Sequence, residues 1–422
     1  MGRTQDGIFA LVTRVVAVAM TALLLASSTA CGNSMPNAAP LRYLYATVDQ
    51  VFLMDGANQV AAVDREMGPY DDPRMSEAAW TGNGKYVGFL AIPQTIVLDA
   101  AGNDVGSDRQ SLTIIDAQSG KVANYPCAVC TQVVAVGDRF WVLQGSHFQV
   151  RQLDPAAAQP GFATITLSGL TRTRPALMVP TLFGGPEGAA LITQSFDSGV
   201  VDNRERRALY LADAEGVARP VGDYPMIGRV QAATATSTDQ AGHMALTSTL
   251  GTGHCSSRTS SFWTLSADTP QLAATDMTAM RPAQSQSSNF GVKLSQPWWG
   301  KDGHFHVAAA RWTCTGPTQR IGSDAGLIKN ILPWRIFRLD GSRWVDENIE
   351  ALASVELSAD TRVDHHSPTC VADKTINPQQ DIPDHTPVDQ VCLSGPLVLT
   401  TPAGTKQING AAAALWPQPP TG

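Results

Sequence analysis

One irregular stretch near the C-terminus, residues 362–391, concentrates acidic and imidazole side chains among proline and other polar residues. Groups of these two kinds can hold a metal ion or transfer protons near neutral pH. The candidate loop site that they define consists of Asp364, His365, His366, Asp384 and His385, with Asp381 nearby. The competing interpretation is a surface loop pinned by a disulfide between Cys370 and Cys392, and we favour it.

Two further groups offer ligand-type side chains without the rest of a metal site. His304 and His306 alternate, so on a strand they share one face, as two metal ligands would. Only Cys314 lies near as a third ligand, and packing of both histidines within a sheet is the favoured interpretation. Residues 92–110 lack the D-x-[DN]-x-[DN]-G spacing of a calcium loop, although they include Asp99, Asn103, Asp104 and Asp108. We therefore expect no metal and no cofactor.

Sequence motifs of the common enzyme classes are absent. The chain has no G-x-S-x-G turn, no phosphate-binding P-loop, no G-x-G-x-x-G and no H-E-x-x-H. This absence of motifs favours a protein that binds over one that catalyses.

The N-terminal 30 residues have the organisation of a secretory signal. Arg3 and Arg14 precede an uncharged, mostly apolar stretch of 12 residues, 15–26, and small residues follow it. Twelve residues are too few to cross a bilayer, which needs about 20. The export signal predicts an extracytoplasmic protein.

Cys31 directly follows Ala30 and begins the sequence CGNS. This junction resembles the lipobox of bacterial lipoproteins, although Ser28 stands where leucine is usual. The resemblance implies that Cys31 carries fatty acids such as palmitate and anchors the chain to the cell membrane. Residues 31–40 would then be a short tether. Simple secretion after ordinary signal cleavage is the alternative.

The cysteine count agrees with lipidation, because six of the seven cysteines remain if Cys31 carries lipid. An even set in an exported protein predicts disulfides. Their order along the chain suggests the pairs Cys127–Cys130, Cys255–Cys314 and Cys370–Cys392. The first pair also has the C-x-x-C spacing of redox-active thiols. Strand-like sequence surrounds it, and we favour a structural bridge.

The composition indicates short strands joined by turns. Charged residues make up only 16% of the chain, whereas it has 36 glycines and 27 prolines, which supply turn geometry. A net charge of −7 leaves no surplus of positive charge for the phosphates of nucleic acid, so we expect no nucleic-acid partner.

Two kinds of hairpin recur every fifty to sixty residues. The first kind is an apolar approach, a turn and an apolar run, with turn glycines at Gly84, Gly137, Gly188, Gly242 and Gly303. The second kind is an alternating strand, a turn that begins with aspartate and another strand, with Asp55, Asp116, Asp154, Asp213, Asp268 and Asp340. A looser seventh instance surrounds Gly404. Each unit thus holds two hairpins, or four strands.

Both hairpins resemble those of TolB-like and WD40-like propeller repeats. The resemblance implies an all-β fold, a β-propeller over residues 41–417, with seven four-stranded blades as the favoured count and six or eight as alternatives. The first unit has no opening hairpin, and we expect the chain end, residues 410–416, to supply its missing strand. A solenoid with the same hairpins is the alternative architecture.

The favoured function is a lipid-anchored extracytoplasmic β-propeller that acts as a binding or scaffolding protein at the cell envelope, since the fold itself defines no activity. We expect a monomer whose partners are the membrane, through its lipid, and a protein or another cell-envelope component. One alternative is a propeller enzyme that acts on an envelope glycan or another extracellular substrate through carboxylates in the channel. Another is an accessory subunit of an envelope complex.

Overall fold

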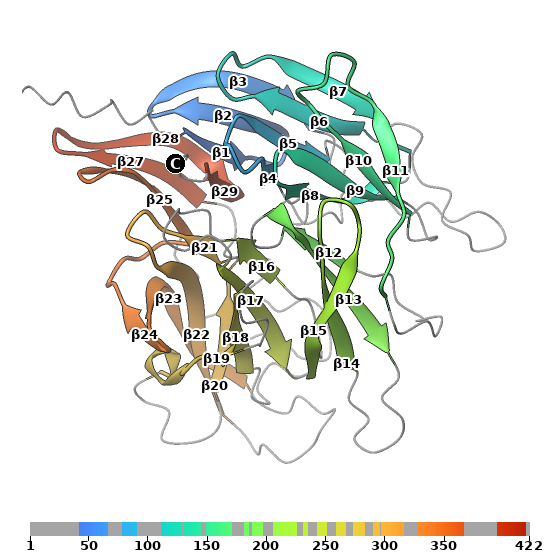
Figure 1. The fold of residues 1–422 in the computed structure, drawn as a ribbon. Helices are drawn as coiled ribbons and strands as arrows, with labels where there is room; N and C mark the ends of the chain where they lie inside the picture. Colours follow the sequence, from blue (N-terminus) through green and yellow to red (C-terminus); the bar gives the residue numbers. More distant parts are fainter. Residues whose placement is uncertain are drawn as a thin grey trace, which may run out of the picture. The chain divides into compact units, whose positions relative to one another are not determined.

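The computed structural model describes residues 42–65, 78–90, 111–128, 130–144, 149–170, 181–184, 188–196, 206–225, 231–234, 243–250, 259–266, 273–282, 290–295, 297–315, 327–366 and 395–418. All of them belong to the compact unit Leu41–Gly422, which is separate from the unit Met1–Pro40. No helix in this described part is long and apolar enough to cross a membrane. Strands dominate it (Figure 1).

The first four sheets contain four antiparallel strands each. Sheet 1 has the order β29 (Ala414–Pro417), β1 (Arg42–Ala46), β2 (Gln50–Asp55), β3 (Asn58–Asp64). Sheet 2 contains β4 (Ala79–Trp80), β5 (Tyr86–Leu90), β6 (Ser111–Asp116) and β7 (Val122–Pro126). Sheet 3 contains β8 (Cys130–Val136), β9 (Arg139–Gln144), β10 (Gln149–Leu153) and β11 (Phe162–Ile165). Sheet 4 contains β12 (Thr181–Gly184), β13 (Ala190–Phe196), β14 (Arg206–Ala212) and β15 (Ala218–Pro225).

Three more sheets follow in the described part. Sheet 5 contains β16 (Gln231–Thr234), β17 (His243–Leu250), β18 (Thr259–Ser266) and β19 (Ala273–Ala274). Sheet 6 contains β20 (Phe290–Leu294), β21 (Trp298–Trp299), β22 (Phe305–Thr315), β23 (Leu327–Asp340) and β24 (Arg343–Asp346). Sheet 7 contains β25 (Ala353–Ser358), β26 (Thr361–His365), β27 (Gly395–Thr401) and β28 (Gly404–Ala412). Sheet 6 has five strands because β20 and β21 both pair with β22 and together occupy the first position.

Successive sheets pack through their apolar faces in a closed order. Buried clusters join sheet 1 to 2, 2 to 3, 3 to 4, 5 to 6 and 7 back to 1. The remaining cluster packs sheet 6 against Ala351 and Leu352 of the link to sheet 7, and Lys301 beside β21 binds the carbonyl oxygen of Leu357 in β25. Sheets 4 and 5 meet through β12 and β16. First strands also contact first strands, β4 with β8, β8 with β12, β16 with β21 and β25 with β29. Four-stranded sheets that meet in this way define an all-β β-propeller, as predicted.

The chain end closes the first sheet. Strand β29 pairs antiparallel with β1, and Tyr43 lies opposite Pro417 (Figure 1). Leu415 packs in the cluster shared with sheet 7, whereas Trp416 packs in the cluster shared with sheet 2. The predicted closure is confirmed, although the added strand is residues 414–417 and residues 410–412 belong to β28. A strand from the C-terminus thereby takes the first position in the N-terminal sheet.

The recurrent aspartates shape the turns of the second hairpins. Asp116 Oδ1 accepts hydrogen bonds from the backbone N–H groups of Gln118 (2.9 Å) and Ser119 (2.8 Å). Asp213 Oδ1 accepts hydrogen bonds from the backbone N–H groups of Glu215 (3.1 Å) and Val217 (2.8 Å), two and four positions later. A short carboxylate that binds the next backbone N–H groups replaces strand pairing with a turn. At Asp116, Asp154 and Asp213 these bonds are the physical reason for an aspartate at the turn.

Each sheet therefore has two unlike ends. Because neighbouring strands are antiparallel, the turns between first and second strands and between third and fourth strands lie at one end, which we call the tight-turn end. The links between second and third strands, and those from one sheet to the next, leave from the other, the connection end. Residues 91–110 and 366–394 are such links by their place between strands, and they lie outside the described residues except for His366.

Close packing at Gly291 gives a prediction for stability. A Cβ atom at this position in β20 would overlap the ring of Trp312, which is fully buried. We expect Gly291→Ala to lower the free energy of unfolding by about 1–3 kcal/mol, because the ring has no room to move. Gly161→Ala is the matched control, since its Cβ would meet no atom within 4 Å. Chemical denaturation of both variants measures the difference; equal stabilities would contradict the packing argument.

Cys127 and Cys130 are joined by a disulfide between the end of β7 and the start of β8. Their side chains are 1% and 0% exposed. A redox-active pair needs a thiol that its partners can reach. We expect a glutathione buffer to leave this pair oxidised in the native protein, and a reductant with denaturant to release two thiols in the corresponding peptide. Release without denaturant would indicate a redox pair instead.

The predicted pairs Cys255–Cys314 and Cys370–Cys392 lie outside the described side chains.

Candidate functional site

The described members of the predicted loop site do not converge. Asp364 is buried in β26, where it accepts hydrogen bonds from Ser354 Oγ (2.6 Å) and Arg362 Nε (2.8 Å). His365 Nε2 donates to the carbonyl oxygen of Ala412 (2.7 Å), and His366 Nδ1 donates to that of Glu350 (2.7 Å). Successive residues on a strand point to opposite faces, so Asp364 and His365 cannot act on one ligand.

Asp364, His365 and His366 therefore do not form one acid–base site by themselves: the first two bind within sheet 7, and His366 binds the link between sheets 6 and 7. Asp381, Asp384 and His385 lie outside the described residues, as do Asp99, Asn103, Asp104 and Asp108. Burial lowers the pKa of His365 to about 4, so this imidazole stays neutral inside the sheet.

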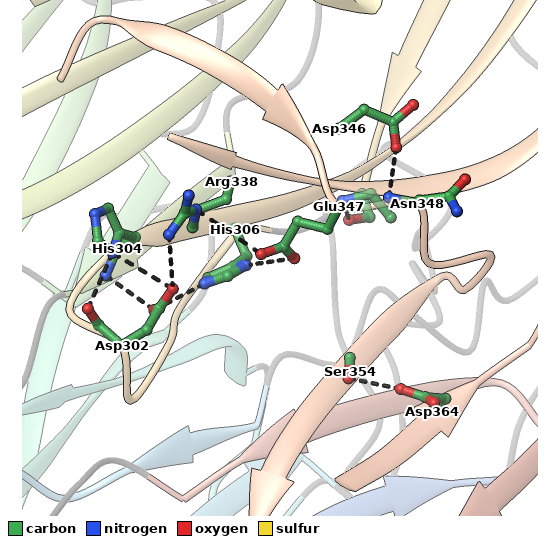
Figure 2. Close-up of polar contacts among 11 residues, drawn as sticks. Asp302, His304, His306, Arg338, Asp346, Glu347, Asn348, Ser354 and Asp364 are labelled. Carbon is green, nitrogen blue, oxygen red and sulfur yellow. Dashed lines mark hydrogen bonds and ion pairs between the residues drawn. The ribbon is translucent and has the colours of Figure 1, made fainter. Parts of the chain in front are cut away.

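A different polar cluster lies in sheet 6, around His306 (Figure 2). The ring of His306 binds a carboxylate at each nitrogen: Nε2 is 3.0 Å from Asp302 Oδ1, and Nδ1 is 3.2 Å from Glu347 Oε2. Arg338 lies beside both acids, with N–O distances of 3.9 Å to each. His304 Nδ1 is 3.4 Å from Asp302 Oδ2. We call Asp302, His306, Arg338 and Glu347 the His306 cluster.

Strand register brings the His306 cluster together. His306 of β22 lies opposite Trp298 of β21 on one side and Arg338 of β23 on the other. Asp302 belongs to the turn between β21 and β22, and the ring of Trp298 stacks on that of His306. Gly300 leaves the necessary room, because a Cβ atom there would lie 2.5 Å from His306 Nε2.

The charges of the His306 cluster stabilise one another. Burial alone would lower the pKa of His306, but hydrogen bonds and the negative charges of Asp302 and Glu347 outweigh burial and raise it to about 9. For Asp302 burial acts in the opposite direction and would raise the pKa, but the hydrogen bonds to His306 and to the backbone of His304, together with the charges of these residues, hold the pKa below its ordinary value. At neutral pH the cluster holds two cations and two anions.

This arrangement does not fit a metal ion, although ligand atoms of Asp302, His306 and Glu347 lie within 4.8 Å of one another. The two carboxylates bind opposite nitrogens of one imidazole, so an ion at one nitrogen would be remote from the acid at the other. Within the described residues the cluster is an internal ion-pair network. His306 is buried in β22, whereas His304 lies in the turn before this strand and its side chain is 33% exposed. The expectation that both histidines pack within a strand therefore describes His306 and not His304.

A small pocket adjoins the His306 cluster where three first strands, β21, β25 and β29, come together. Residues that line it include Trp298, Lys301, Glu347, Glu356, Arg362 and Gln418. Lys301 Nζ donates to the carbonyl oxygen of Leu357 across the two sheets (2.7 Å). The cavity volume is about 50 Å³, far below the roughly 300–1,000 Å³ of ordinary small-molecule sites. The polar groups that line the pocket bind one another, and the space between them is too small for a large ligand.

The sequence contained only part of the signal for the His306 cluster. His304 and His306 were recognisable from their alternation, and Asp302 precedes His306 by four residues in a turn. Glu347 and Arg338 lie 41 and 32 positions beyond His306, and only the register of β22, β23 and β24 brings them together. No local pattern marks such partners.

Comparison with known proteins gives similarity of fold alone. No protein-family model matches the chain, and no curated protein matches its sequence. The β-propeller domain of the trilobed protease from Pyrococcus furiosus is 6% identical over 86% of this chain and 87% of its own, with a TM-score of 0.42. AztD from Citrobacter koseri is 10% identical over 90% and 97%, with a TM-score of 0.44. The polysaccharide lyase Uly1 is 9% identical over 88% and 91%, also with a TM-score of 0.44.

Proposed function

We propose that this chain is a lipid-anchored extracytoplasmic β-propeller that binds a protein or another cell-envelope component. In this proposal Cys31 carries the lipid, residues 31–40 are the tether, and each of the seven described sheets is one blade. The connection end of the sheets is the binding surface. Loops held by a rigid scaffold are where binding residues concentrate.

The observation that carries this proposal is the contrast between the two ends of the sheets. At the tight-turn end, β9 follows β8 after two residues and β24 follows β23 after two residues. At the connection end, 20 residues separate β5 from β6 and 29 separate β26 from β27. Most connections in compact domains have about 4–6 residues, and much longer ones are commonly functional. Long links all leaving from one end suit a recognition surface.

The His306 cluster lacks the free acids that the enzyme alternative needs. An enzyme that uses channel carboxylates needs acids that are available to a substrate. Asp302 and Glu347 instead bind His306 and Arg338, and the adjoining cavity of about 50 Å³ is too small for a sugar chain. These facts weigh against the enzyme alternative at this site.

Affinity capture from membranes tests the proposed function. The full chain is purified after cross-linking, its partners are identified by mass spectrometry, and its own N-terminal peptide is analysed for lipid on Cys31. We expect an acylated Cys31 and a specific protein or envelope partner. A free Cys31 would overturn the anchor, and turnover of an envelope glycan by the purified chain would overturn the binding role.

Matched surface variants locate the binding end. Val48 and Ala128 are exposed at the connection end, whereas Gln118 and Ala214 are exposed in turns at the tight-turn end. We expect Val48→Arg with Ala128→Arg to lower partner recovery about tenfold, because new charges in an interface oppose docking. Gln118→Arg with Ala214→Arg adds the same charge and should leave recovery unchanged. The reverse result would place binding at the tight-turn end.

A further inference from the structure

Arg311 is a buried cation that has no hydrogen-bond or ion-pair partner among the described residues. It belongs to β22 and is only 9% exposed. Its Nε is sealed from solvent without a hydrogen bond, whereas Nη1 and Nη2 are not sealed in this way. A buried charge is strongly unfavourable unless it is paired and hydrogen-bonded. An arginine in this state is a candidate for binding an anion that comes from outside the chain.

The neighbours of this guanidinium in sheet 6 are apolar. Val292 of β20 lies opposite Arg311 on one side, and Leu332 of β23 lies opposite it on the other. The Cζ atom of Arg311 lies 5.2 Å from the centre of the Phe337 ring. The ring attracts the cation through its π electrons, but it supplies no acceptor in the plane of the guanidinium N–H groups.

Asp346 is the carboxylate whose charge acts on Arg311, but its oxygens are used elsewhere. Oδ2 accepts a hydrogen bond from Arg335 Nη1 (3.2 Å), and Oδ1 accepts one from the backbone N–H of Asn348 (2.8 Å) (Figure 2). Burial lowers the pKa of Arg311, the charge of Asp346 raises it, and the charge of Arg335 lowers it again. Asp346 is therefore the partner of Arg335 and leaves Arg311 unpaired.

The sequence of the facing sheet supplies no carboxylate either. Arg311 follows Ala309 on the same face of β22, and this face packs on Ala245 of sheet 5. Residues 243–266, which include β17 and β18 of that sheet, contain no aspartate and no glutamate. Residues 277–301, which include β20, contain none. The link from β22 to β23 has one acid, Asp324, which lies outside the described residues.

We propose that Arg311 anchors a binding site for the carboxylate group of an organic ligand, on the face of sheet 6 that packs on sheet 5. One guanidinium balances the single charge of one carboxylate, and the two planar groups form two parallel hydrogen bonds. Phosphate carries more charge at neutral pH and needs further donors, which the side chains of Val292, Leu332 and Phe337 lack. The same apolar side chains suit the hydrocarbon part of an organic acid.

The site lies toward the connection end of sheet 6. Strand β22 starts at the tight-turn end, and Arg311 lies past its middle. The site is thus on the side that we propose for binding a partner, but it does not depend on that partner or on the lipid anchor. A small carboxylate and the purified full chain are enough to test it.

Titration of the full chain with 4-fluorobenzoate, followed by the ¹⁹F signal of the ligand, tests the site. The matched ligand is 4-fluorobenzamide, which has the same shape and no charge. We expect 4-fluorobenzoate to bind with a dissociation constant on the order of 1 mM. The amide and inorganic phosphate are expected to bind at least about tenfold more weakly, because neither combines one negative charge with an apolar ring. Equal binding of the amide, or tighter binding of phosphate, would overturn the carboxylate site.

Arg311→Met tests the anchor, because it removes the charge and keeps a long unbranched side chain. We expect binding of 4-fluorobenzoate to weaken about thirtyfold or more, as when one partner of a buried charge pair is removed. Without ligand, the variant should be at least as stable as the native chain, since no internal partner loses its cation. Arg151→Met is the matched control: Arg151 also lies over a phenylalanine ring, that of Phe162 (4.8 Å), but it is only half-buried. This variant should bind like the native chain.

An internal ion pair is the alternative that the same measurements exclude or establish. Undiminished binding of 4-fluorobenzoate by Arg311→Met would overturn the proposal. So would an equal loss of stability in Arg311→Met and Asp324→Asn, because Asp324 would then be the partner of Arg311. If Arg311→Met fails to fold, the two fluorinated ligands on the native chain and the stability of Asp324→Asn still decide: preference for the carboxylate with an unchanged stability supports the site, and any other combination overturns it.

Discussion

A chain that ends at Ala413 is expected to lose its cooperative thermal unfolding transition, because it lacks the strand that closes sheet 1. Leu415 and Trp416 of β29 are 8% and 6% exposed and pack on different neighbouring sheets. Removing a buried leucine costs about 2–5 kcal/mol and a buried tryptophan about 3–5. Their sum is comparable to the whole stability of a typical domain, about 5–15 kcal/mol. Far-ultraviolet circular dichroism against temperature measures the loss.

Two controls isolate the role of closure from simple shortening. A chain that ends at Gln418 removes only residues 419–422, and we expect it to unfold like the full chain. Trp416→Ala keeps the strand and should lower the free energy of unfolding by about 3–5 kcal/mol without abolishing the transition. A sharp transition in the chain ending at Ala413, at an unchanged temperature, would show that the open sheet is stable by itself.

The repeated hairpins were predictable because their causes are local. Alternation of apolar and polar residues identifies a strand, and aspartate at the turn binds the next backbone N–H groups whatever lies around it. The turn glycines have the same local origin: Gly84, Gly137, Gly188 and Gly303 all have positive φ. Closure by the chain end followed from counting, because the first unit lacked one hairpin.

The polar sites were less predictable because their causes are not local. Asp364 and His365 are adjacent in sequence, yet the strand turns them to opposite faces and gives them unrelated partners. Conversely, His306 and Glu347 are remote in sequence, yet register places them 3.2 Å apart. Proximity in sequence therefore does not identify the partners of a buried polar side chain. Burial, which determines whether a histidine is charged, is likewise set by the packing of whole sheets.

This difference between His306 and His365 gives a large expected effect of pH on stability. The free energy of unfolding is expected to be highest near pH 6.5, where an unfolded histidine titrates, and to fall on both sides. His306 has its pKa raised to about 9, so its contribution is complete below pH 6.5 and is lost as the pH rises through 9. His365 has its pKa lowered to about 4, so its contribution is complete above pH 6.5 and is lost as the pH falls through 4.

We call the fall in the free energy of unfolding above pH 6.5 the alkaline limb and the fall below pH 6.5 the acid limb. Each fall is expected to amount to about 3 kcal/mol, since one pKa unit corresponds to about 1.4 kcal/mol. The acidic partners do not add to the alkaline limb, because the low pKa of Asp302 expresses the same interaction with His306. Urea denaturation at intervals from pH 4.5 to 9 measures both limbs. A free energy of unfolding that stays constant from pH 6.5 to 9 would contradict the charged state of His306.

Substitutions assign each limb to its histidine. The readout is the slope of the free energy of unfolding against pH, so a variant can be compared with the native chain even if the two differ in stability at a given pH. His306→Gln should flatten the alkaline limb, and His365→Gln should flatten the acid limb while its amide still donates to the carbonyl of Ala412. His366→Gln is the control: it should keep the alkaline slope and change the acid slope only slightly, because the charge of His366 is the smallest of the named causes of the lowered pKa of His365. If a variant fails to fold, NMR titration of the imidazole C–H signals in the native chain gives the same two pKa values directly. If both variants keep both slopes, the pH dependence comes from other groups, and the prediction that these two histidines cause it is wrong.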